Sequence, residues 1–129
     1  MLQTGVDHSW VINPCVRTIE QGKKMLPTDK DHWFYDPAAF ERGILKPKLL
    51  MDNECPWIYH NMAIQVNGDV VPCCRDNQGT EPMGNLLSHD LDEIWNGAKY
   101  VDFRKRLHED QGRVKICRLC SSYGTSPLN

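Results

Sequence analysis

Apolar and polar residues alternate most clearly on either side of Asn67 and Gly68. The flanking segments 62–66 and 69–73 are short and rich in valine and isoleucine, as strands usually are. Asn-Gly is also the dipeptide preferred in two-residue hairpin turns. We therefore predict a β-hairpin over residues 62–73.

The predicted hairpin orients two adjacent cysteines differently. A two-residue turn pairs Ile64 with Val71, and successive side chains on a strand point to opposite faces of the sheet. Cys73 then lies on the largely apolar face that contains Ile64 and Val71, and Cys74 lies on the other face. A bulge at Pro72 would reverse this assignment.

Two helices are predicted after the hairpin. Ser88 suits an N-cap, acidic residues follow in the first turn, and apolar residues continue to Trp95. Gly97 ends or kinks this helix. A second helical run extends from Ala98 to about Glu109 and carries Val101, Arg104 and Leu107 toward the final cysteines.

The first part of the chain, residues 1–54, has a different pattern. Prolines interrupt its short apolar stretches, so we expect an irregular N-terminal extension without an obvious core. Strand-like pieces lie near residues 10–12 and 49–51. One short helix is predicted over residues 36–43, where aspartate suits the N-cap, proline the first helical position and glycine the end.

Size and charge restrict the class of protein. The chain has 129 residues, the size of one domain with extensions. No segment approaches the roughly 20 apolar residues of a membrane-spanning helix, and no export signal is visible. With a net charge of -2, the chain has no excess of positive charge to bind the phosphate backbone of a nucleic acid. We expect a cytoplasmic protein without a membrane or nucleic-acid partner.

Six cysteines carry the candidate chemistry. Cytosolic thiols stay reduced, which favours metal ligation over disulfides. Cys117 and Cys120 form a C-x-x-C pair, Cys55 precedes the predicted hairpin, and Cys73 lies at its end. Four thiolates from three segments would bind one metal centre, and such a set suits either an iron-sulfur cluster or zinc.

Other candidate ligands are weaker. The histidines show neither H-x3-H nor H-E-x-x-H spacing, and only His60 lies near Cys55 in the sequence. Cys15 stands alone in an irregular segment, and we expect it to be a buried thiol. An apolar shell for the metal centre would come from Trp57, Ile58, Met62 and Trp95.

The cysteine pattern resembles the SPASM and twitch domains of radical-SAM enzymes. Such domains begin with C-x(9-15)-G-x4-C, and here Cys55 is followed by twelve residues, Gly68, four residues and Cys73. The resemblance continues through residues 83–86, 91–96 and 104 to Cys117-x-x-Cys120. It implies an α+β fold, with a small β-hairpin followed by helices around a metal cluster.

The resemblance implies one [4Fe-4S] cluster on Cys55, Cys73, Cys117 and Cys120. Full SPASM domains carry further cysteines for a second cluster, but here Ser126 stands at the first of those positions. The C-x3-C-x2-C signature of the SAM-cleaving cluster is also absent from this sequence. We therefore expect no catalysis by these residues alone.

The function implied by the resemblance is that of an auxiliary cluster module in a radical-SAM oxidoreductase or a peptide- or small-molecule-modifying enzyme. Residues 55–129 would form the cluster-binding domain, and residues 1–54 the linker to a radical-SAM core domain, in cis or in trans. The module would transfer electrons, position the substrate, or both. The alternative is a four-cysteine zinc-binding structural or interaction module without a redox role.

Overall fold

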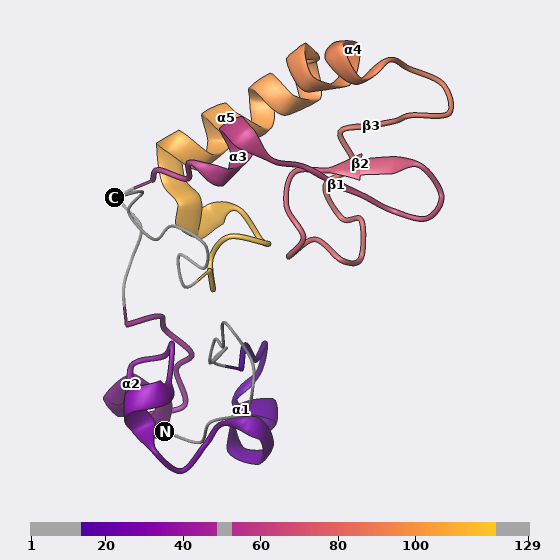
Figure 1. Ribbon diagram of the computed structural model, residues 1–129. Helices are drawn as coiled ribbons and strands as arrows, with labels where there is room; N and C mark the ends of the chain where they lie inside the picture. Colours follow the sequence, from indigo (N-terminus) through magenta and orange to yellow (C-terminus); the bar gives the residue numbers. More distant parts are fainter. Residues whose placement is uncertain (1–13, 49–52, 121–129) are drawn as a thin grey trace, which may run out of the picture. The chain divides into compact units, whose positions relative to one another are not determined.

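The computed structural model describes residues 14–48 and 53–120 of the chain. The chain divides into two compact units, Met1–Lys48 and Leu49–Asn129. Figure 1 labels their helices and strands. The strand-like pieces expected near residues 10–12 and 49–51 lie outside the described residues. In the described part of the chain, no helix has the length and apolar character needed to cross a membrane.

The first unit contains more helix than the sequence suggested. Its elements are α1 (Ile19–Met25), the 3-10 helix η1 (Lys30–His32) and α2 (Pro37–Glu41). Helix α2 confirms the predicted helix, because the Asp36 side chain caps it and Gly43 follows with φ of 78°. Helix α1 was not predicted, although Thr18 caps it by accepting a hydrogen bond from the Gln21 N–H.

This unit also has a small core, contrary to our expectation for residues 1–54. Its buried apolar side chains are Val16, Tyr35, Ala39 and Phe40. The Tyr35 hydroxyl donates to the Val16 carbonyl and accepts from the Val16 N–H, both at 2.8 Å. Gly22 lies directly against the Phe40 ring, where a β-carbon would clash. The sequence pattern did not predict this core, because the contacts within the core join residues far apart in the sequence.

The second unit contains a small antiparallel sheet. Its strands are β1 (Ala63–Ile64), β2 (Asp69–Val71) and β3 (Gly84–Asn85), in the order β1-β2-β3. The sheet is followed by helices α4 (Leu91–Asn96) and α5 (Ala98–Asp110) and the 3-10 helix η2 (Gln111–Arg113), and preceded by α3 (Trp57–His60). The predicted α+β class and the β-hairpin are confirmed.

The register of the hairpin differs by one residue from the prediction. Ile64 pairs with Val70, not with Val71. The Gln65 N–H donates to the Asp69 carbonyl, which leaves three residues in the loop, and Gly68 there has φ of 85°. A three-residue loop ending in a left-handed glycine is the next most common hairpin connection after the two-residue turn.

The predicted apolar face of the hairpin was therefore wrong. Val70 and Val71 are both buried, whereas the Ile64 side chain is 57% exposed. Burial on both faces of β2 arises because the chain around it, not the hairpin alone, supplies the packing. The facing of the strand therefore does not distinguish Cys73 from Cys74 as the ligand. The burial and contacts of each thiol must do so.

The helices after the sheet also differ from the prediction in one detail. Helix α4 is capped by a box of Asp90 and Glu93, not by Ser88. The Ser88 hydroxyl instead donates to the Asn85 carbonyl at 3.2 Å. Gly97 separates α4 from α5, as predicted.

The core of this unit lies between α5, α3 and the sheet. Helix α5 buries Tyr100, Phe103 and Leu107, which share one helical face, whereas Val101 is exposed. The other buried members are Ile58, Val70, Met83, Ile94 and Val114. Cys55 and Cys117 pack against this core, together with Met62 and Trp95, two of the residues expected to form an apolar shell.

Candidate metal centre

Cys55 lies immediately before α3. Its thiol is half-buried, and this burial raises its pKa above the ordinary value. Hydrogen bonds from the backbone N–H groups of Ile58 and Trp57 act in the opposite direction and lower it. These N–H groups belong to the first turn of the helix, where they have no partner within the helix.

Cys73 follows β2 in a turn closed by a hydrogen bond from the Asp76 N–H to the Cys73 carbonyl at 2.9 Å. Burial is the main cause that raises the pKa of its thiol to about 11, while the backbone N–H of Arg75 lowers it. The neighbouring thiol of Cys74 also raises this pKa. Cys73 is partly buried, whereas Cys74 is exposed.

Cys117 and Cys120 share one turn after α5 and η2. The Cys120 N–H donates to the Cys117 carbonyl at 2.8 Å, which turns the C-x-x-C segment back on itself. Burial, followed by the charges of Cys120, Cys55 and Cys73, raises the pKa of Cys117 to about 12. One thiol therefore interacts electrostatically with the three other candidate ligands.

Two polar contacts bring these separate segments together. The Arg75 guanidinium donates to the Leu119 carbonyl at 3.1 Å and thereby links the Cys73 turn to the C-x-x-C turn. The Asn53 side chain accepts from the Gln111 N–H at 3.0 Å, which ties the chain before Cys55 to the end of α5. Sequence reasoning identified neither contact because each joins residues more than 40 positions apart.

The donor set fits a cluster bound by cysteine. Its four members are thiols from three segments, and all are partly buried. Iron-sulfur clusters are usually held by four such thiolates, and zinc accepts the same ligands. In residues 14–48 and 53–120, no group of three or more His, Cys, Asp or Glu side chains already has the arrangement that holds a metal ion. Binding must also release the thiol protons that the raised pKa values retain.

Two further candidate residues are exposed. Cys15 belongs to the first unit and is exposed, so its prediction as a buried thiol was wrong. His60 is exposed at the end of α3.

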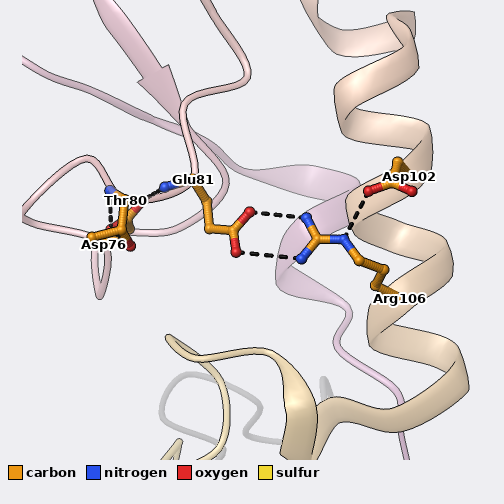
Figure 2. A network of polar contacts seen from close by, with 5 residues as sticks. All are labelled: Asp76, Thr80, Glu81, Asp102 and Arg106. Atoms are coloured by element: carbon orange, nitrogen blue, oxygen red, sulfur yellow. Dashed lines mark hydrogen bonds and ion pairs between the residues drawn. The ribbon is translucent and has the colours of Figure 1, made fainter.

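A buried carboxylate holds the loop that follows Cys73. Asp76 accepts hydrogen bonds from the N–H and hydroxyl of Thr80, at 2.8 and 2.7 Å, and from the N–H of Glu81 at 2.8 Å. The Glu81 carboxylate receives two hydrogen bonds from Arg106 on α5, which also pairs with Asp102. Figure 2 shows this network between the loop and the helix. The sequence analysis did not predict this network, although an aspartate followed by a threonine four residues later suits a closed loop.

Arg104 on α5 lies among three aromatic rings. Its guanidinium is 4.5 Å from the centroid of Trp95, 4.6 Å from that of Tyr100 and 5.5 Å from that of Tyr59. It also donates to the carbonyls of Ile58 and Trp95, at 3.4 and 3.0 Å. Arg104 on α5 thus contacts residues of α3 and α4, helices that Figure 1 labels.

Comparison with known proteins identifies the class to which this site belongs. The family model for the SPASM iron-sulfur cluster-binding domain matches residues 55–121. This segment begins at Cys55 and includes all four candidate ligands. The chain therefore belongs to the SPASM iron-sulfur cluster-binding family, and the resemblance seen in the sequence is confirmed.

One curated relative is similar over a larger segment. The S-adenosyl-L-methionine-dependent 2-deoxy-scyllo-inosamine dehydrogenase of Niallia circulans is 34% identical over 84 residues. The match covers 62% of this chain and 34% of that protein. The chain thus matches about a third of the length of this relative. No solved structure matches the chain.

Proposed function

We propose that Cys55, Cys73, Cys117 and Cys120 hold one [4Fe-4S] cluster. The observation that carries this proposal is the match of an iron-sulfur cluster-binding family model to residues 55–121, a segment that contains all four cysteines. Membership of an iron-sulfur cluster-binding family supports iron and sulfide over zinc as the occupant. Four thiolates are the usual ligand set of such a cluster.

The chain would serve as an auxiliary cluster module of a radical-SAM oxidoreductase. A bound cluster supplies a site that accepts or donates one electron. The residues of the chain supply its thiolate ligands, the N–H donors of Ile58 and Arg75, and an apolar surface that limits access of water. The Niallia circulans relative is named as a SAM-dependent dehydrogenase, which supports an electron-accepting role and a small-molecule substrate.

The remaining functions belong to a radical-SAM core domain, in cis or in trans. We propose residues 55–129 as the cluster-binding domain and residues 1–54 as the segment that links it to the core. The cysteines of this sequence, at positions 15, 55, 73, 74, 117 and 120, do not form the C-x3-C-x2-C signature needed for SAM cleavage. Substrate positioning would be a second contribution of the module.

Anaerobic reconstitution tests the proposed cofactor. We expect about four irons and four sulfides per chain, with the broad visible absorption of a cluster. Cys117→Ser should lose most of the iron because it removes one of the four proposed thiolate ligands. Cys15→Ser is the matched control and should load normally.

Two outcomes would contradict the proposal. A colourless chain with one zinc per molecule, obtained under anaerobic conditions with iron and sulfide present, would identify the structural zinc module instead. Eight irons per chain would show that a second cluster is bound and that the ligand set is incomplete.

A further inference from the structure

Three side chains of the second unit each carry a buried hydrogen-bond donor without a partner among the described residues. They are the indole Nε1 of Trp57, the hydroxyl of Tyr100 and the Nη2 of Arg104. Each is a hydrogen-bond donor, and a donor buried in a protein interior is nearly always paired. An iron-sulfur cluster contains sulfur atoms that accept hydrogen bonds.

Tyr100 is the donor with a direct relation to a candidate ligand. Its side chain is fully buried in the core against which Cys55 and Cys117 pack. The charge of Cys73 acts on its hydroxyl, so the two groups lie within electrostatic reach of each other. In residues 14–48 and 53–120, no atom accepts a hydrogen bond from this hydroxyl.

The surroundings hold the Tyr100 ring in place. Its centroid lies 4.9 Å from that of Trp95, and the Arg104 guanidinium covers its face at 4.6 Å. A cation over the ring withdraws electron density from it, which makes the hydroxyl a stronger donor. The packing thus fixes the direction of the hydroxyl and increases its capacity to donate.

We propose that the Tyr100 hydroxyl donates a hydrogen bond to a sulfur atom of the bound cluster and thereby raises its reduction potential. The inference rests on the proposed function, since it requires the cluster. Hydrogen bonds to cluster sulfurs stabilise the additional negative charge of the reduced form. Tyr100 would tune the cluster without ligating iron.

Redox titration of the reconstituted chain, followed by electron paramagnetic resonance, tests the inference. Tyr100→Phe keeps the ring and removes only the hydroxyl. We expect the equilibrium constant for one-electron reduction to fall about tenfold, which is about 59 mV toward more negative potential. Tyr59→Phe is the matched control, because it removes the same group from a second ring beside Arg104 whose hydroxyl pairs with His108. Its potential should equal that of the wild type.

Replacing Tyr100 with 3-fluorotyrosine provides a second test if the phenylalanine variant fails to load. Fluorine strengthens the donor and keeps the ring, so the potential should move in the opposite direction. Unchanged potentials in the variants at position 100, with a loaded wild type, would overturn the role of Tyr100 alone. A wild-type chain that binds no iron-sulfur cluster would overturn both this inference and the proposed function.

Discussion

At the scale of single residues, the environment distinguishes two adjacent cysteines. Cys73 is partly buried and its thiol interacts with that of Cys120, whereas Cys74 is exposed. The Arg75 N–H donates to the sulfur of Cys73. A backbone donor directed at one of two neighbouring sulfurs is typical of a ligand to a cluster.

Single serine substitutions should therefore separate the two positions. Cys73→Ser should retain less than half of the iron after anaerobic reconstitution, because a thiolate ligand is lost. Cys74→Ser should retain about four irons per chain. Iron analysis with equal protein loading measures both, and the reverse result would assign the ligand to Cys74.

At the scale of elements, the loop between β2 and β3 depends on Asp76. This carboxylate is only 2% exposed and satisfies three donors of Thr80 and Glu81. The loop starts at the Cys73 turn and is linked to α5 through Glu81 and Arg106. Its geometry thus influences where the sulfur of Cys73 lies relative to the helix.

Asp76→Ala should destabilise this loop, because buried donors lose an ionised acceptor. We expect a loss of about 2–3 kcal/mol, which lowers the urea concentration for half-loss of the cluster by on the order of 1 M. Asp76→Asn keeps one carbonyl acceptor, so its urea midpoint should lie between those of the wild type and Asp76→Ala. The visible absorption of the loaded chain in anaerobic urea gives the measurement.

Gln78→Ala is the control for this prediction. Gln78 belongs to the same loop and is exposed, so its truncation should leave the midpoint unchanged. Equal shifts in the alanine variants at 76 and 78 would mean that the carboxylate contributes nothing specific to the loop.

At the scale of the whole molecule, metal binding should contribute to folding in one unit only. The four thiols join segments of the second unit that are separated by up to 65 positions (120 − 55) in the sequence. The free energy of ligand binding in such a site is also free energy of folding. The first unit has its own small core around Tyr35 and Phe40.

Removing the cluster with a chelator under reducing conditions should therefore affect the second unit more than the first. Amide hydrogen exchange measured by mass spectrometry should accelerate in peptides from residues 53–120 and change little in those from residues 14–48. The first unit serves as the internal control. Equal acceleration in both ranges, or none in residues 53–120, would contradict this coupling.

The sequence alone determined features that depend on neighbouring residues. Asp36 and Pro37 begin a helix, Gly97 separates two helices, and an Asn-Gly dipeptide turns a hairpin, because caps and turns follow from local backbone geometry. The family of the domain also followed from the sequence, because the spacing of its cysteines and Gly68 is a linear pattern.

The tertiary structure decided whatever depends on distant contacts. The hairpin register changed by one residue, and with it the burial of Ile64, because loop geometry and packing together select the pairing. The sequence likewise did not predict the core around Tyr35, the Asp76 network or the Tyr100 hydroxyl, which has no hydrogen-bond partner in the described part of the chain. Spacing indicates which residues can serve as ligands, but only folding determines which groups surround them, because those groups come from elements far apart in the chain.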